Sequence, residues 1–459
     1  MAYDFDIIMI GGGPGGYVAA IRAAQLGKSV CLIEKKSSLG GVCLNEGCIP
    51  TKTIIKSVRM LKSVLESEDF GVRGIVRENC YLDLEAVQKR KAQVVSRLTG
   101  GVAFLLQQNK VEVVRATAIF ESAHAVNVDG RKISAENIII ATGSLPVLPP
   151  IPQEGEVPLI LSEDALELRE VPGATVIIGG GVIGLEFAYI FSQLGSKVTI
   201  VETMDEILPS IDPELTQRVR AKLKKLGVEV YTKAKVARLV GREVWVTQQE
   251  RQLLLRADKV LMATGRRPNI DDLNLAAAGV LSGREGIPVN PKMQTNIPNV
   301  YAIGDVTGKY MLAHVASMEG MVAVENISGM NREMDYARIP QGIYLDPEIA
   351  TVGLSEEEAK ALGYEVKIGR FNFAANGKAV LEGEEDGFIK IIIDKRLEEI
   401  LGVHIMGAHA TDMISELTLA MTLEGTAQEV VQTIHPHPTI AEVIPEAFHA
   451  VLHRAIHAI

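Results

Sequence analysis

The sequence predicts an α/β protein in which one strand–turn–helix–strand unit occurs twice, with a mixed α+β region at the C-terminal end. A segment that runs from Phe5 to Glu34 is repeated from Ala174 to Glu202, and each copy has a Gly-rich turn after its first apolar run. Beyond residue 339, strand-like runs such as FIKIII and GVHIMG occur among amphipathic helical stretches. The 459 residues exceed what one hydrophobic core supports, so two to four domains are expected.

The two copies align at a constant offset of 168 residues, and each carries G-x-G-x-x-G and ends in an acid. In a βαβ unit the first Gly makes the tight turn, the second lets the backbone approach a pyrophosphate, and the third lets the helix pack on the strand. The pyrophosphate lies at the helix N-terminus, and the acid binds ribose hydroxyls. One Gly-rich turn would be weak evidence, but two in the same context predict two Rossmann-like dinucleotide-binding domains. The aligned positions are Gly11 and Gly179, Gly13 and Gly181, Gly16 and Gly184, and Glu34 and Glu202.

The acid of the second copy favours NAD over NADP. Glu202 is followed by Thr203 and Met204, without a neighbouring Arg or Lys to receive a 2′-phosphate. A carboxylate at this place would repel that phosphate. Two further apolar runs, NIIIATGS (137–144) and KVLMATGRRPN (259–269), each end in Ala-Thr-Gly, as expected where a strand meets a nucleotide at its carboxyl end.

Four cysteines are too few for a disulfide scaffold in a chain of this length. Cys31 lies in the apolar run VCLIE and Cys80 stands beside Tyr81, so both are interpreted as small packed side chains without a role. Cys43 and Cys48 lie five residues apart, a spacing that separates them by roughly 140° on an ideal helix.

A bridge between Cys43 and Cys48 therefore requires a distorted first turn, for which Gly47 and Pro50 are suitable residues. A zinc site would need a second pair of ligands, which the neighbouring sequence does not offer. Two inert thiols remain the alternative on spacing alone. Their position directly after the first dinucleotide unit favours a redox pair.

Four segments resemble the pyridine nucleotide–disulfide oxidoreductases, and the resemblance spans essentially the whole chain. The segment that holds the cysteine pair is similar to the family's redox-disulfide segment, and MLAHVASMEG is closer to the lipoamide-oxidising members than to glutathione reductases. The segments are GGVCLNEGCIPTK (40–52), NVYAIGDV (299–306), MLAHVASMEG (311–320) and HPHPTIAE (435–442).

The resemblance implies roles for single residues. Cys48 would be the thiolate that lies against the flavin, and Cys43 the interchange thiol that forms a mixed disulfide with substrate. Lys52 and Glu186 would form an ion pair beside the reactive flavin nitrogen. The implied FAD contacts are Gly11, Gly13, Gly16, Glu34, Lys52, Thr142, Gly143, Ser144, Asp305 and Ala313; the implied NAD contacts are Gly179, Gly181, Gly184, Glu186, Glu202, Val236 and Gly265; no metal is expected.

The base motif implies that His437 is the general acid–base. It would take a proton from the incoming dithiol, because only a thiolate attacks, and an imidazole titrates near neutrality. Glu442 would orient His437. The alternative is a capping box, since Thr439-Ile-Ala-Glu442 has the S/T-x-x-E pattern, and the two roles are hard to combine in one carboxylate.

The resemblance also implies an obligatory homodimer in which His437 of one subunit reaches the disulfide of the other. The predicted organisation is an FAD-binding domain at 1–145 with a helical region at about 53–108, an NAD-binding domain at 146–267, a return to the FAD side at 268–338, and a C-terminal dimerisation domain at 339–459. The implied activity is oxidation of dihydrolipoyl groups with FAD and NAD⁺ as cofactors.

The implied partners are the lipoyl domains of 2-oxo acid dehydrogenase or glycine-cleavage complexes. A related FAD-dependent reductase with another thiol or disulfide substrate is the first alternative. A flavin-dependent NADH oxidase or transhydrogenase is the second, although hydride exchange alone needs neither a dithiol nor its base.

Some residues depart from the family pattern. Ala116 and Ala118 stand where the family usually has a Gly-x-Gly pair, Leu345 and Asp346 are unusual in GIYLDPEIATVG (342–353), and GAHATDM (407–413) also varies. Asp346 near the substrate channel would bear on substrate preference.

The bulk composition bears on partners and location. A net charge of −10 argues against a nucleic-acid partner. No apolar run approaches the ~18 residues that cross a bilayer. The sequence has no basic leader before its first apolar stretch, so we expect a cytoplasmic protein.

Overall fold

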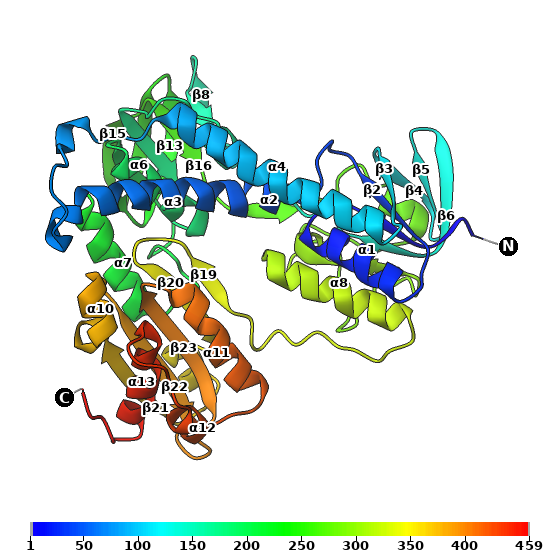
Figure 1. Cartoon of the computed structure of the whole chain (residues 1–459). Helices are drawn as coiled ribbons and strands as arrows, with labels where there is room; N and C mark the ends of the chain where they lie inside the picture. Colours follow the sequence, from blue (N-terminus) through cyan, green and yellow to red (C-terminus); the bar gives the residue numbers. More distant parts are fainter. Residues whose placement is uncertain (1–2, 458–459) are drawn as a thin grey trace.

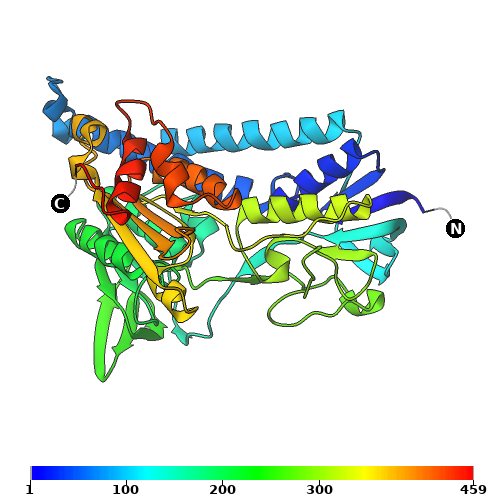
Figure 2. The same ribbon diagram turned by 90° about the horizontal axis from the view of Figure 1, so that it is seen from below.

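The computed structural model describes residues 3–457 and shows three groups of strands and helices (Figures 1 and 2). The mixed α/β class with two parallel dinucleotide-type sheets confirms the predicted fold class. The two chain ends lie at opposite sides of the molecule in both views. Within the described residues no helix is long and apolar enough to cross a membrane.

The first sheet has seven strands in the order β3-β2-β1-β6-β5-β4, and β18 pairs with β6. β1, β2, β3 and β18 run parallel to one another and to the end of β6, while the start of β6 pairs antiparallel with β5. The short strand β18 therefore returns the chain to this sheet after residue 268. The strands are β1 (Phe5–Ile10), β2 (Val30–Glu34), β3 (Glu112–Arg115), β4 (Ala118–Ser122), β5 (Ala125–Val128), β6 (Arg131–Ile140) and β18 (Val300–Ala302).

Two helices cover one face of this sheet, and two long helices lead away from it (Figure 1). α1 (Pro14–Gln25) crosses α8 (Ala313–Ile327) at close range, because a Cβ on Gly320 would lie 2.8 Å from the Gly15 carbonyl oxygen. The helical region predicted at 53–108 is two helices, α3 (Cys48–Leu65) and α4 (Leu84–Gln108). They are joined by the short helices η1 (Ser67–Phe70) and η2 (Arg77–Asn79).

The second group is inserted between β7 (Ser144–Pro146) and β17 (Arg266–Pro268), which pair antiparallel. Its parallel sheet has the order β12-β11-β10-β16-β9, and an antiparallel sheet of order β15-β14-β13-β8 lies with it. Its helices are α5 (Ser162–Ala165), α6 (Val182–Gln193) and α7 (Pro213–Lys225). Its strands are β8 (Gln153–Glu154), β9 (Leu159–Ile160), β10 (Ala174–Ile178), β11 (Lys197–Val201), β12 (Glu229–Tyr231), β13 (Ala234–Val240), β14 (Glu243–Gln248), β15 (Arg251–Arg256) and β16 (Lys259–Met262).

The C-terminal group is a five-stranded antiparallel sheet of order β19-β20-β23-β22-β21 with helices packed on it. All eight residues of β23 are buried, as expected for a continuous apolar run. The elements are β19 (Gln341–Ile343), β20 (Glu348–Gly353), α9 (Glu356–Ala361), β21 (Val366–Asn372), α10 (Gly377–Glu382), β22 (Phe388–Asp394), β23 (Ile400–Gly407), α11 (Ala410–Thr422), α12 (Ala427–Gln432) and α13 (Val443–Val451). The short helices η3 (Leu275–Ala278), η4 (Gly304–Thr307), η5 (Phe373–Ala375) and η6 (Ile440–Glu442) complete the chain.

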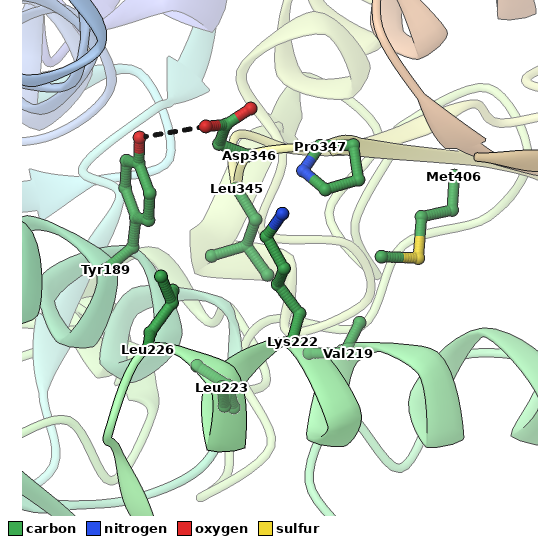
Figure 3. Close-up of a pocket in the computed structure, with 9 residues that line it drawn as sticks. All are labelled: Tyr189, Val219, Lys222, Leu223, Leu226, Leu345, Asp346, Pro347 and Met406. Atoms are coloured by element: carbon green, nitrogen blue, oxygen red, sulfur yellow. Dashed lines mark hydrogen bonds between the residues drawn. The ribbon is translucent and has the colours of Figure 1, made fainter. Parts of the chain in front are cut away.

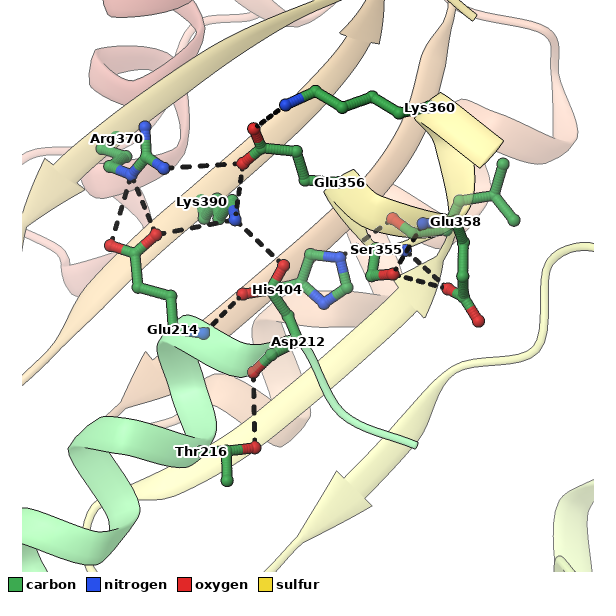
Figure 4. Close-up of polar contacts among 11 residues, drawn as sticks. Asp212, Glu214, Thr216, Ser355, Glu356, Glu358, Lys360, Arg370, Lys390 and His404 are labelled. Carbon is green, nitrogen blue, oxygen red and sulfur yellow. Dashed lines mark hydrogen bonds and ion pairs between the residues drawn. The ribbon is translucent and has the colours of Figure 1, made fainter. Parts of the chain in front are cut away.

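A buried ion cluster joins α7 to the C-terminal sheet (Figure 4). The Lys390 Nζ lies 2.9 Å from Asp212 Oδ2, 3.0 Å from Glu356 Oε2 and 3.5 Å from Glu214 Oε2. The side chains of Lys390 and Asp212 are only 4% and 1% exposed. Asp212 also caps α7 by accepting from the Glu214 N–H, so one carboxylate serves both elements.

We expect Lys390→Met to lower the free energy of unfolding by about 3–5 kcal/mol, because the buried Asp212 carboxylate loses its cation. Chemical denaturation of the holoenzyme measures this change in the free energy of unfolding. Lys395→Met is the matched control, because Lys395 pairs with Glu365 on the exposed surface, and it should change stability little. Equal stability of the two variants would contradict a stabilising role for this cluster.

Candidate active site

The cysteine pair lies where two helices meet. α2 (Gly41–Glu46) holds Cys43 and ends before Gly47, whose φ of −143° and ψ of −112° interrupt the helix. α3 then begins at Cys48. The two cysteines are therefore not five positions apart on one helix, and the distortion that the sequence required occurs at Gly47.

The Cys43 and Cys48 side chains lie in hydrogen-bonding contact, and their thiols differ in acidity. The hydrogen bond from Cys43 lowers the pKa of Cys48 to about 7, and the Lys52 charge acts in the same direction against burial. The same hydrogen bond and burial raise the pKa of Cys43. Cys48 is thus the more acidic thiol of the pair.

The other two cysteines differ in burial. Cys31 is fully buried in β2, and this burial raises its thiol pKa to about 12. Cys80 lies half-buried in the loop between η2 and α4, so it is less packed than the sequence predicted.

An ion pair stands one helical turn beyond Cys48. The Lys52 Nζ lies 2.8 Å from Glu186 Oε2, and the Glu186 side chain is only 4% exposed. The other Glu186 oxygen accepts from the Tyr344 N–H at 3.2 Å, and the Lys52 Nζ lies 4.8 Å from the centre of the Tyr344 ring. Tyr344 was not predicted as a site residue, although it lies in the GIYLDPEIATVG segment, directly before the unusual Leu345 and Asp346.

The first Gly-rich turn has the geometry of a pyrophosphate cradle. A Cβ on Gly11 (φ +109°) would lie 2.3 Å from the Ala141 carbonyl oxygen, and one on Gly16 would lie 1.9 Å from the Gly11 carbonyl oxygen. No side chain fits at either position. Glu34 is 8% exposed and accepts from the Gly12 and Lys36 N–H groups, both at 2.8 Å. One lone pair on each carboxylate oxygen remains for a ribose hydroxyl.

The second turn repeats these contacts. A Cβ on Gly179 (φ +112°) would lie 2.2 Å from the Ala263 carbonyl oxygen, and one on Gly184 would lie 2.1 Å from the Gly179 carbonyl oxygen. Glu202 is 8% exposed and accepts from the Gly180 N–H at 2.6 Å and the Met204 N–H at 2.7 Å. The sequence repeat is therefore a repeat of hydrogen bonds as well.

Both cradles fit a dinucleotide, since each presents a helix N-terminus, a turn without side chains and an oriented carboxylate. Of the other residues predicted for the second site, Gly181 is the N-cap of α6 and Gly265 (φ +100°) follows β16, whereas the Val236 side chain is buried in an apolar core. Gly13 holds the matching N-cap position of α1.

The two Ala-Thr-Gly segments meet through β7 and β17. Thr142 Oγ1 donates to the Asn269 carbonyl oxygen at 2.6 Å, and the Asn269 amide returns a bond to the Thr142 carbonyl oxygen. Ser144 donates to Asp305 and accepts from Arg266. Gly143, at φ +73°, forms the bend between them. The sequence analysis named Ser144 and Asp305 but missed Arg266.

Asp305 is held from a second side. Burial raises its pKa, while Ser144 and the Arg266 charge act in the opposite direction. The preceding residue, Gly304, donates its N–H to Glu319 Oε2 at 2.6 Å, and the Tyr336 hydroxyl donates to Glu319 Oε1 at 2.6 Å. Glu319 was quoted only as part of MLAHVASMEG, and its fully buried carboxylate fixes the turn that presents Asp305. Ala313 begins α8 beside this turn.

His437 and Glu442 are paired as the base motif implied. His437 Nδ1 lies 2.9 Å from Glu442 Oε1, while Glu442 Oε2 accepts from the Thr439 N–H at 2.8 Å. The expectation that the two contacts are hard to combine in one carboxylate was wrong, because each oxygen makes one of them. Although burial opposes it, the bonds from Thr439 and His437 lower the pKa of Glu442.

The base motif and the cysteine pair are far apart within one chain. The α12–α13 connection lies at the bottom of the C-terminal group, whereas α2 lies beside the start of α3 near the centre of the molecule (Figure 1). His437 is 79% exposed. The side chain of nearby His435 is only 6% exposed, so it is packed against the protein. Its bond to Glu416 raises its pKa.

The residues that depart from the family pattern have packing roles. Ala116 donates its N–H to the Glu34 carbonyl oxygen, and Ala118 is buried in the first core. Asp346 lies 2.6 Å from the Lys62 Nζ and 3.4 Å from the Tyr189 hydroxyl, at the wall of a small cavity between α6, α7 and the C-terminal group (Figure 3). Its carboxylate is therefore engaged by protein groups, and its pKa is lowered by Lys62 in spite of burial.

Comparisons with known proteins show the family to which the chain belongs. Residues 5–320 match the pyridine nucleotide-disulphide oxidoreductase model, and residues 339–448 match the dimerisation domain of the same family. A dihydrolipoyl dehydrogenase of Bacillus subtilis is 42% identical over 100% of both chains. One of Geobacillus stearothermophilus is 42% identical over 100% of this chain and 98% of its own.

Among solved structures, the HOCl-induced flavoprotein disulfide reductase RclA from Escherichia coli is 28% identical. It has a TM-score of 0.86 and covers 96% of this chain and 99% of its own. The family uses FAD and NAD(H), in agreement with the two cradles. The chain belongs to the pyridine nucleotide–disulphide oxidoreductase family.

Proposed function

We propose that this enzyme is a dihydrolipoyl dehydrogenase, which oxidises dihydrolipoyl groups to the cyclic disulfide and passes the electrons to NAD⁺. The observation that carries the proposal is the unequal thiol pair, with Cys48 as thiolate and Cys43 as thiol, beside the Lys52–Glu186 ion pair. Relatives that match the whole chain at 42% identity have that name, which supports the choice of substrate.

Substrate oxidation follows from thiol–disulfide exchange. His437 of the partner subunit takes a proton from one substrate thiol, and the thiolate attacks the Cys43 sulfur of the disulfide. The Cys43–Cys48 bond breaks, Cys48 leaves as the thiolate, and a mixed disulfide joins Cys43 to the substrate. His437 releases that proton to solvent and takes the proton of the second substrate thiol, whose thiolate attacks the substrate sulfur linked to Cys43. The mixed disulfide breaks, and Cys43 leaves and receives this proton from His437. The cyclic disulfide product is released, and two electrons remain on the pair.

The chain's residues then prepare the transfer to NAD⁺. The bound FAD supplies two-electron transfer between the dithiol and the nicotinamide. Glu34 and Asp305 hold the FAD through its ribose and ribityl hydroxyls, and Glu202 holds the NAD ribose. Lys52 stabilises the Cys48 thiolate, and Glu186 holds Lys52 in place.

We further propose that the active site is shared between two subunits. His437 is exposed and far from the cysteine pair of its own chain, and it belongs to the region that matches the dimerisation domain. The physiological donors are lipoyl domains of 2-oxo acid dehydrogenase or glycine-cleavage complexes.

Turnover of the purified flavoprotein with free dihydrolipoamide and NAD⁺ tests the substrate. The proposal expects rapid NADH formation, and reduced glutathione as donor serves as the comparison. If neither dihydrolipoamide nor a free lipoyl domain reduces the bound flavin while NADH does, the substrate assignment fails and a disulfide reductase with another substrate remains.

Exchange of the ribose-binding acid will alter the choice between cofactors. We expect Glu202→Gln to lower kcat/KM for NAD⁺ by about 10- to 100-fold, because a charge-assisted bond to the ribose becomes neutral. Repulsion of a 2′-phosphate also falls, so the preference for NAD⁺ over NADP⁺ should shrink. Steady-state kinetics with both cofactors measure the change. Asp205→Asn is the matched control, since its carboxylate is exposed and pairs with Lys233.

A further inference from the structure

We propose that Tyr344 is a positioning residue for Lys52, and that it lets the C-terminal domain control the charge beside the redox pair. The inference rests on the proposed roles of Cys48 and Lys52. Tyr344 is not among the site residues predicted from the sequence. Three segments far apart in sequence meet at one ammonium group: α3 provides Lys52, α6 provides Glu186, and the β19–β20 connection provides Tyr344.

The contacts leave Lys52 with little freedom. Glu186 Oε2 fixes the distance of the Nζ at 2.8 Å, but one ion pair does not fix the direction of a side chain with four rotatable bonds. The Tyr344 ring lies against the same ammonium at 4.8 Å and occupies a second side. A cation–π contact of this kind is favourable, because the ammonium is attracted to the face of the ring.

Tyr344 contacts the Glu186 carboxylate as well as the Lys52 ammonium. Its N–H donates to Glu186 Oε1 at 3.2 Å, which leaves Oε2 directed at Lys52. The Tyr344 hydroxyl donates to no atom of residues 3–457, so the ring and the N–H are the parts that act. Phenylalanine at this position would keep both contacts, and leucine would keep only the N–H.

The residues that follow Tyr344 hold the connection against α3. The Leu345 carbonyl oxygen accepts from Arg59, and Asp346 pairs with Lys62 at 2.6 Å. Lys52, Arg59 and Lys62 recur at intervals of seven and three residues, which places them on one stripe of the helix that begins at Cys48. The segment from Tyr344 to Asp346 therefore runs along α3.

Holding Lys52 in one position affects the pKa of Cys48. Lys52 is one of the groups that lower the pKa of Cys48, so its average position sets part of the thiolate's stabilisation. When the ring is removed, Lys52 samples other rotamers and its mean distance from the Cys48 sulfur increases. The thiolate then forms at higher pH, although neither cysteine has been changed.

The test is a pH titration of the flavin–thiolate absorbance in the two-electron-reduced holoenzyme, for wild type, Tyr344→Leu and Tyr344→Phe. We expect the midpoint to move upward in Tyr344→Leu and to return to the wild-type value in Tyr344→Phe. Tyr364→Leu is the matched control, because that tyrosine lies 40% exposed elsewhere in the same domain. Its midpoint should not move.

A double-mutant cycle separates positioning from a general loss of structure. In a Lys52→Met background, Tyr344→Leu should produce no further shift of the midpoint, because the group that it positions is absent. An unmoved midpoint in Tyr344→Leu, or an equal additional shift in the Lys52→Met background, would overturn the proposal. The titration uses no dihydrolipoamide, so a wrong substrate assignment leaves its outcome unaffected.

Discussion

Replacement of Cys43 by Ser is expected to lower turnover with dihydrolipoamide by about 10⁴-fold or more, since it removes the atom that forms the mixed disulfide. Serine oxygen is not a nucleophile or leaving group in thiol–disulfide exchange, so neither half of the exchange can proceed. Stopped-flow measurement of flavin reduction by the dithiol gives the loss directly.

The same variant should keep the exchange of electrons between the flavin and NADH. In the proposed mechanism, reduction of the bound flavin by NADH depends on Glu202, Glu186 and Lys52, which Cys43→Ser leaves in place. A serine hydroxyl is also a hydrogen-bond donor, so the Cys48 thiolate remains supported, and the pH midpoint for its formation should stay near that of the wild type. If dihydrolipoamide turnover survives in Cys43→Ser, Cys43 is not the interchange thiol.

Cys31→Ser is the matched control for this experiment. Cys31 is fully buried in β2, and its thiol has a pKa of about 12, so it forms no thiolate at neutral pH. The substitution buries a hydroxyl in the core and is expected to lower stability, but a folded Cys31→Ser protein should retain turnover. The contrast therefore separates the redox role of a cysteine from its packing role.

The sequence was sufficient to predict the parts that repeat or that stand in a motif. The duplicated Gly turns predicted both cradles, because the steric requirement at positions such as Gly16 leaves no alternative side chain. The need for a distortion between Cys43 and Cys48 could also be stated from helix geometry alone, and the break occurs at Gly47.

The parts that were missed depend on contacts between distant segments. Tyr344, Arg266 and Glu319 act on residues that lie 158, 122 and 15 positions away, and no local periodicity records such pairs. The expectation that Glu442 could hardly make both of its contacts failed for a different reason. A carboxylate has two oxygens that can accept hydrogen bonds from different donors, and the residue type alone does not indicate whether both do so.

His437→Gln is the second change with a large expected effect, a loss of roughly 10²- to 10⁴-fold in the rate at which dihydrolipoamide reduces the flavin. Glutamine occupies similar space but cannot accept and return a proton. The loss should diminish as the pH approaches the pKa of the substrate thiols, because the free thiolate then needs no base. A loss that does not depend on pH would indicate that His437 binds the substrate and does not move its proton.

The two contacts of Glu442 give this experiment its internal comparison. Glu442→Gln keeps an oxygen that can accept from the Thr439 N–H, so stability should be nearly unchanged, but the charge beside His437 Nδ1 is lost. Glu442→Ala removes both bonds and should cost about 0.5–2 kcal/mol of stability through the lost cap. If Glu442 orients His437, the two variants will lose similar catalytic rates and differ in stability. If it serves only as the cap, Glu442→Gln will keep the wild-type rate.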